Sequence, residues 1–274
     1  MKINTNVMAL NAQNKLTVNQ GKVEKSIRKL SSGFRINTAS DDASGLAISE
    51  KMRAQIRGLK QAHSNAQDGI SMIQTAEGAL QQTTDILQRM RELIVKSENT
   101  GVLTDSDRTS ITTELTALED EIDRIAKSTT FNTKKLLDGS LGSSGATFKI
   151  GANTYTEDCI TVTISSMKAL DLGITIDIST PANAATALTN IDTAINRVST
   201  QRANLGAIQN RMEYAVENLS TTCENLTAAE SRIRDVDMAN EMVTYTKNSI
   251  LNQTAMSMLA QANQQPQQIL SLLQ

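Results

Sequence analysis

The sequence predicts a mainly α-helical protein: an elongated antiparallel coiled-coil bundle of two N-terminal helices and one long C-terminal helix, with a small β excursion and apolar terminal helices. Three observations predict this class. Two distant segments place apolar residues about 3.5 residues apart, which is typical of helices that supercoil around each other. Aromatic residues make up only 2% of the 274 residues, and a narrow aliphatic seam needs none. Both chain ends are apolar at helical spacing.

The C-terminal repeat, residues 188–233, organises the chain. Positions taken alternately three and four residues apart along this segment hold apolar residues or Cys223. The exceptions are Arg202, Gln209 and Glu230. Because a helix cannot bury such a stripe against itself, we expect a partner helix of similar length. The apolar positions of this stripe, called the long seam below, are Leu188, Ile191, Ile195, Val198, Leu205, Met212, Val216, Leu219, Leu226 and Ile233.

The N-terminal half supplies that partner in residues 52–94, which follow the same spacing. Residues 3–34 form a basic amphipathic helix before it. Ser40-Asp41-Asp42 offers a helix cap with acids in the first turn, where the helix dipole favours negative charge. The turn Asn99-Thr100-Gly101 ends the helix.

A third helix follows at residues 104–126. Thr104 and Asp107 supply cap chemistry. The apolar residues from Ile111 to Ile125 keep heptad spacing, so this helix can fold back on the preceding one as an αα-hairpin.

The pattern changes between residues 128 and 180. Residues 160–164 and 174–178 alternate with period two and are β-branched, which predicts strands. Residues 147–155 form a third, weaker candidate around a turn. We expect a small β excursion at one end of the bundle.

The long C-terminal helix opens with Thr180 as cap and Pro181 in the first helical position. It ends near Ile233 at a charged joint, residues 234–237. A further helix is expected over residues 238–262, with Gln264-Gln265-Pro266 interrupting it. The predicted domains are terminal helices at 1–44 plus 235–274, a coiled-coil rod at 45–140 plus 181–234, and a β-rich variable region at 141–180.

Both chain ends would expose apolar side chains in a single molecule. Other subunits would cover them, and a head-to-tail contact between copies builds a filament. The candidate assembly residues are Ile3, Val7, Leu10, Val243, Ile250, Leu251, Met258, Leu259, Ile269, Leu270, Leu272 and Leu273.

No motif indicates catalysis, a metal or a cofactor. The single histidine, His63, is read as a tolerated seam residue, and the acids around Glu119-Asp120-Glu121 as a solvated face. Cys223 is read as a packed thiol, with a Cys159–Cys223 disulfide left open. A net charge of −2 gives no general attraction to nucleic acid or membrane. Without an apolar leader, we expect a cytoplasmic protein or an export route that reads no cleavable signal.

Two pairs of segments resemble the terminal signatures of bacterial flagellins. Leu30–Asn37 and Asp41–Ile48 resemble the N-terminal signature, and Ala228–Ala239 and Leu259–Pro266 the C-terminal one. The resemblance implies a structural subunit, exported by the flagellar type III apparatus, that polymerises into the extracellular filament for motility. The terminal helices would form its inner core, the heptad section the surrounding layer, and the β excursion the outer face.

The resemblance also implies partners. A flagellar export chaperone would bind the C-terminal helical segment, and filament cap and hook–filament junction proteins would meet the polymer. The family motif for the flagellin-sensing Toll-like receptor of animals matches residues 87–93, with its acidic contact on the next helix. The residues implied are Gln88, Arg89, Glu92, Leu93 and Glu114.

Two other functions remain open. A flagellar hook–filament junction protein of similar build is the first. A helical signalling module is more distant, because it would need a membrane span and a tight hairpin between equal helices in mid-chain.

Overall fold

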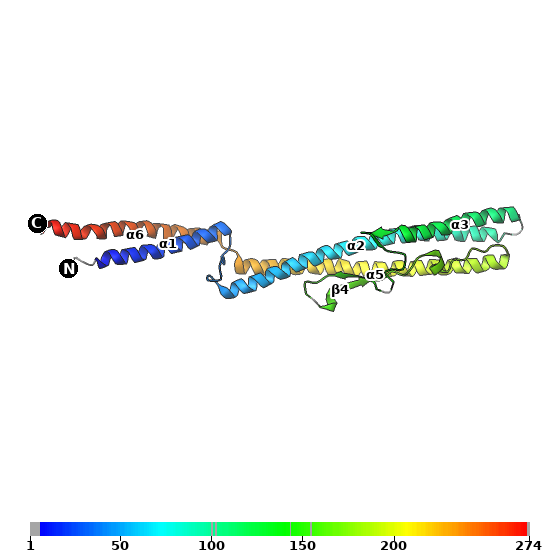
Figure 1. Cartoon of the computed structure of the whole chain (residues 1–274), viewed down its shortest axis with the longest axis horizontal. Coiled ribbons are helices and arrows are strands. Elements are labelled where there is room, and N and C mark those ends of the chain that lie inside the picture. Colours follow the sequence, from blue (N-terminus) through cyan, green and yellow to red (C-terminus); the bar gives the residue numbers. More distant parts are fainter. Residues whose placement is uncertain (1–5, 100, 102, 143, 154, 273–274) are drawn as a thin grey trace. The chain divides into compact units, whose positions relative to one another are not determined.

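The computed structural model describes residues 6–99, 101, 103–142, 144–153 and 155–272, without the side chains of Pro181 and 266–272. Helices dominate it (Figure 1), which confirms the mainly α-helical class. Contacts gather in two compact units: Met1–Ala54 with Glu224–Gln274, and Gln55–Cys223. The helices are α1 (Val7–Ser32), α2 (Ala43–Ser97), α3 (Asp105–Ser128), α4 (Ala169–Leu172), α5 (Pro181–Arg234) and α6 (Met238–Leu272).

In the second unit, α2 and α5 lie side by side and antiparallel (Figure 1). Arg91 Nε donates to Asp192 Oδ1 over 2.8 Å. Further along, Arg202 Nε donates to Glu77 Oε1 over 2.8 Å. Residue numbers fall on α2 as they rise on α5, which fixes the direction and register of the pair. Arg202 and Glu77 both interrupt apolar stripes, and they compensate each other because they interrupt them at facing positions.

Helix α3 folds back on α2, as its cap and heptad predict. Thr104 Oγ1 accepts from the Asp107 backbone N–H, and the Asp107 carboxylate accepts from the Thr104 backbone N–H, so two orphan donors are satisfied. The Thr104 hydroxyl also donates to Asp107 over 2.7 Å and holds the pKa of that carboxyl below its usual value. The buried face of α3, Ile111, Leu115, Ile122 and Ala126, joins the core formed by α2 and α5.

Two small antiparallel sheets follow α3. Strand β1 (Thr130–Phe131) pairs with β2 (Lys134–Lys135), and β3 (Ala146–Lys149) pairs with β4 (Cys159–Val162). The 160–164 prediction therefore corresponds to β4, and the weaker 147–155 candidate contains most of β3. A short 3₁₀ turn, η1 (Thr156–Asp158), precedes β4.

Residues 174–178 are not a strand, so that prediction was wrong. Ile174 and Ile178 are 5% and 3% exposed and belong to the core. The alternation of isoleucines reflects burial against helices, because an extended segment can present alternate side chains to a core without pairing with another strand.

The β3–β4 hairpin lies against α2 where α2 carries small residues. Asn65 Nδ2 donates to the Lys149 carbonyl over 3.1 Å. A Cβ added to Gly58 would come within 2.9 Å of the Ala152 side chain, so glycine permits that close approach. Small or short residues recur every three or four positions along this part of α2: Gly58, Ala62, Asn65 and Gly69.

Two helix ends differ from the prediction. Helix α2 begins after the acids, so Asp42 acts as the cap, accepting from Gly45 N–H over 2.8 Å, and no acid lies in the first turn. Helix α6 continues to Leu272, so the predicted interruption at Pro266 was wrong. A proline removes one helix hydrogen bond, and a helix can continue if another donor serves the freed carbonyl.

The segment that leads into α2 is bonded to the end of α5 in the first unit. Arg35 N–H donates to the Arg234 carbonyl over 2.6 Å. The Arg234 guanidinium lies 4.7 Å from the centre of the Phe34 ring and donates to Glu50 Oε1 over 2.6 Å. This hydrogen bond from Arg234 holds the pKa of Glu50 below its usual value.

Candidate functional site

The face that α1 and α6 turn toward each other mixes small, polar and large apolar side chains. Lys29 Nζ lies 3.6 Å from Glu241 Oε2 near one end of this pair, and Asn6 Nδ2 donates to the Ala262 carbonyl over 2.8 Å near the other. The helices are therefore antiparallel, as Figure 1 shows. Buried and half-buried positions recur at heptad spacing: Ala9, Ala12, Leu16, Asn19, Val23, Ser26 and Leu30 on α1, and Glu241, Tyr245, Asn248, Asn252, Ala255, Leu259 and Ala262 on α6. We call this the terminal seam.

Many large apolar side chains of α1 and α6 lie outside the terminal seam and are exposed. Val7 is 61% exposed on α1, and Val243 is 71% exposed on α6. An isolated helix pair usually buries its apolar stripe, whereas this pair leaves much of its apolar surface exposed. The exposed large apolar residues are Val7, Met8, Leu10, Val18 and Ile27 on α1, and Met238, Met242, Val243, Ile250, Leu251, Met256 and Met258 on α6.

Six candidate assembly residues, Val7, Leu10, Val243, Ile250, Leu251 and Met258, lie on these exposed faces. Leu259 does not, because it is half-buried in the terminal seam. Ile3 and Leu273 lie outside the described residues. The side chains of Ile269, Leu270 and Leu272 are likewise not described. The predicted assembly set is therefore exposed wherever the structure describes it, apart from Leu259.

The long-seam residues of α5 are all buried or half-buried. The buried ones are Ile191, Val198, Leu205, Met212 and Leu219. The half-buried ones are Leu188, Ile195, Val216, Leu226 and Ile233. Six of them share one core with α2 and α3, so these positions stabilise the fold. They are Leu188, Ile191, Ile195, Val198, Leu205 and Met212.

A charged cluster lies where the receptor motif was expected. Arg89 on α2 donates from Nη2 to Glu114 Oε1 on α3 over 2.9 Å, and from Nη1 to Glu92 Oε2 over 3.3 Å. These bonds, the Glu114 one above all, raise the pKa of the Arg89 guanidinium. All three side chains are well exposed, as is Gln88. Leu93 is only 3% exposed and packs in the core, and its role as a receptor contact stays a prediction.

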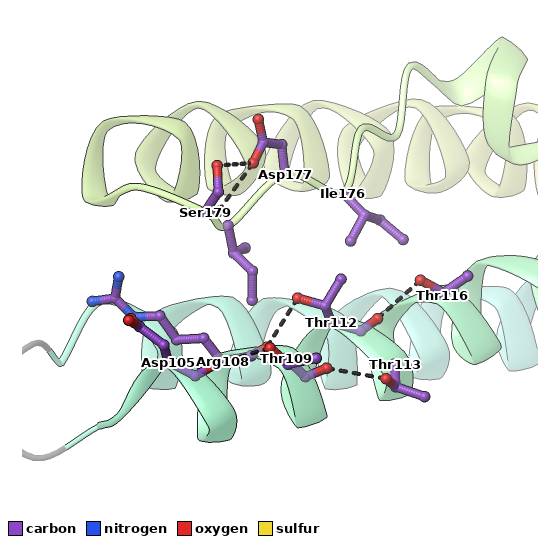
Figure 2. Close-up of a pocket in the computed structure, with 10 residues that line it drawn as sticks. Asp105, Arg108, Thr109, Thr112, Thr113, Thr116, Ile176, Asp177 and Ser179 are labelled. Carbon is purple, nitrogen blue, oxygen red and sulfur yellow. Dashed lines mark hydrogen bonds between the residues drawn. The ribbon is translucent and has the colours of Figure 1, made fainter.

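A groove of about 600 Å³ separates α3 from the segment before α5 (Figure 2). Asp105 and Arg108 flank it on α3, and Asp177 and Ser179 lie opposite. Its threonine hydroxyls, on residues 109, 112, 113 and 116, each donate to a carbonyl one turn earlier in α3. Their protons are thus committed, and no general base contacts them among the residues drawn, so the groove holds no activated nucleophile.

In the described part of the chain, no group of three His, Cys, Asp or Glu residues could hold a metal ion. No disulfide joins Cys159 to Cys223. None of the described helices combines the length and the apolarity that a bilayer span needs.

Comparison with known families matches both ends of the chain. Residues 3–141 match the bacterial flagellin N-terminal helical region, and residues 188–273 match the bacterial flagellin C-terminal helical region. The chain belongs to the bacterial flagellin family. It is therefore a structural subunit of the bacterial flagellar filament, and it polymerises with its own copies.

Curated flagellins agree over their full length. The flagellin of Bacillus subtilis (strain 168) is 52% identical over 305 aligned residues, with 100% of both chains covered. The flagellin of Halalkalibacterium halodurans is 50% identical over 275 aligned residues, again with 100% of both chains covered. Nothing in these comparisons favours a junction protein.

One solved structure shares the helical fold. A putative flagellar hook-associated protein from Vibrio parahaemolyticus aligns with a TM-score of 0.59 over 71% of this chain and 100% of its own. Its identity is 17%, so the likeness shows the fold alone.

Sequence reasoning missed the terminal seam. It recognised the apolar residues but not the small and polar residues that face each other between them. The signal was present, because Ala9, Ala12, Asn19 and Ser26 keep heptad spacing on α1. Searching for apolar residues alone passes over a seam of that kind.

Proposed function

We propose that this chain enters the flagellar filament through the apolar faces that α1 and α6 leave exposed. This proposal is supported by the many large apolar side chains that the terminal pair leaves exposed. The terminal seam already pairs α1 with α6 within one molecule. The outward residues, such as Val243 and Ile250, then remain to be buried by other copies.

The exposed apolar face of α6 also suggests a partner that binds the subunit before assembly. Before assembly, exposed apolar side chains on α6 would promote aggregation, so a flagellar export chaperone that covers α6 fits this surface. The subunit would leave the cell through the flagellar export apparatus and add beneath a cap protein. At the filament base it would meet the hook–filament junction. The expected location is the extracellular flagellum.

Electron microscopy of the purified chain after a heat-and-cool cycle with seeds tests assembly. We expect filaments from the wild-type chain. Val243→Asp should raise the concentration needed for growth by about tenfold or more, because it places a charge in a surface that must be dehydrated.

Leu170→Asp is the matched control. Leu170 is 85% exposed but lies on α4, outside the terminal pair. It should leave growth unchanged. Deletion of Gln265–Gln274 should stop growth. Equal growth of the wild-type chain and the Val243→Asp variant would contradict the role of α6.

The exposed cluster of Arg89, Glu92 and Glu114 supports a second role as a target of the animal flagellin-sensing Toll-like receptor. Arg89→Ala should reduce signalling in reporter cells that carry the receptor. Arg124→Ala, which removes another exposed arginine paired with a glutamate on α3, is the control. Equal signalling by both variants would argue against this cluster.

A further inference from the structure

Helix α6 contains a carbonyl that its own backbone cannot serve. In an α-helix the N–H of residue 266 would donate to the carbonyl of residue 262, but Pro266 has no N–H. Ala262 is only 9% exposed, so solvent gives its carbonyl little help. A buried carbonyl without a donor is costly, and yet α6 continues to Leu272.

The missing donor comes from the other end of the chain. Asn6 Nδ2 donates to the Ala262 carbonyl over 2.8 Å. Asn6 Oδ1 accepts from the Ala9 N–H over 3.0 Å and caps α1. The two partners fix the orientation of the Asn6 amide, because one is a donor and the other an acceptor. One side chain therefore starts α1 and completes α6.

We propose that Asn6 is the latch that docks the N-terminal helix onto α6, with its amide replacing the backbone N–H that Pro266 lacks. Small and polar side chains interrupt the large apolar residues of the terminal seam, so bonds at its two ends help to set its register. Asn6 at one end and the Lys29–Glu241 ion pair at the other define it. Pro266 thus makes α6 depend on α1, and neither helix end is complete without the other.

A set of variants isolates this bond. Asn6→Asp keeps a cap oxygen for Ala9 but cannot donate to Ala262. Asn6→Ser also keeps a cap oxygen, adds no charge and is too short to reach. Pro266→Ala restores a backbone N–H at position 266, so it should make the Asn6 donor unnecessary. Each Asn6 variant is made alone and combined with Pro266→Ala.

Hydrogen exchange of the full chain, measured by mass spectrometry before and after seeding, reads out the latch. Both Asn6 variants should speed exchange at residues 255–265 by about tenfold or more. Pro266→Ala should return that exchange close to the wild-type rate. Unchanged exchange in the Asn6 variants, or no rescue by Pro266→Ala, would overturn the latch.

The latch rests on the proposed function only in assuming that the terminal pair serves assembly. Pelleting of wild-type filaments tests that function separately. If the wild-type chain fails to polymerise, the proposed function fails, while exchange in the unseeded chain still decides the latch.

Discussion

Thr133 lies in a strained backbone conformation. It and Asn132 form the two-residue turn between β1 and β2, with φ values of 67° and 45°. Two-residue hairpin turns favour positive φ, and a glycine in the second position adopts it without strain. A β-branched residue at positive φ is rare, so the backbone strain of this turn is concentrated at Thr133.

Thr133→Gly should therefore stabilise the chain. Relief of left-handed strain outweighs the added freedom of glycine in the unfolded state by about 0.5–1 kcal/mol. Urea unfolding of the purified chain measures this. Thr133→Ala removes the hydroxyl but keeps the strain, so it should give no gain. Stabilisation by both variants would place the cause elsewhere.

Asp123 joins α3 to α4. Its carboxylate accepts from Lys127 Nζ over 2.6 Å and from the Ala169 N–H over 3.0 Å. The Lys127 bond, with help from the Ala169 N–H, lowers the pKa of Asp123 from 3.8. Since the folded pKa lies below the unfolded one, the stabilisation is complete above 3.8 and disappears as the pH falls through the folded value.

Asp123→Asn should thus lower the free energy of unfolding by about 1 kcal/mol at neutral pH. The difference from wild type should vanish well below pH 3.8. Asp120→Asn is the control, since both acids raise the pKa of Glu119 and both variants relieve that repulsion. A difference that persists in acid would contradict the assigned cause.

At the scale of the element, α5 depends on its buried stripe. Leu205 is 0% exposed in the core shared by α2, α3 and α5. Replacing it with a charge leaves that charge without a partner in an apolar seam.

Leu205→Asp should destabilise the chain by about 3 kcal/mol or more. Ala207→Asp, two residues away on the exposed face, should cost only the difference in helix propensity, about 0.7 kcal/mol. Thermal and urea unfolding followed by circular dichroism compares them. Similar losses in the two variants would mean that the long seam is not the buried face.

Elements with local signals could be predicted from sequence. Thr104 and Thr180 mark helix starts, and heptad spacing identifies the buried face of α5. The failures depended on distant residues. Ile174–Ile178 has strand chemistry but meets helices, and α6 passes Pro266 with a donor supplied from Asn6. No local pattern reports such a partner.

Part of the candidate site was also accessible from sequence. Exposed apolar ends follow from residue type and spacing. Leu93 shows the limit, because a linear motif places it beside Arg89 and Glu92 without revealing that it is buried in the core. Burial of one residue by another helix requires the three-dimensional packing.

At the scale of the whole molecule, apolar burial is uneven. The large core cluster draws its residues from Met72 to Met212, all within the second unit. In α1 and α6 the buried residues among those described are only Ser26, Asn248 and Ala262. Segments with few buried apolar contacts open at low free energy.

Limited proteolysis of soluble chains shed by heat or acid should therefore cleave the ends first and leave a resistant middle of about residues 45–235. Seeding before protease addition should protect the ends, because other copies cover them. Mass spectrometry of the fragments measures both results. Early cleavage within residues 72–94 would contradict this order of stability.

Tyr245 gives the terminal seam an optical property. The chain has three tyrosines and no tryptophan. Tyr155 and Tyr214 are exposed at 64% and 73%, whereas Tyr245 is half-buried between α1 and α6. Ultraviolet emission from this chain thus comes from three phenol rings, of which only one sits between the terminal helices. The quenching and anisotropy of Tyr245 emission would report the pairing of α1 with α6 in real time, without a dye or an added fluorophore.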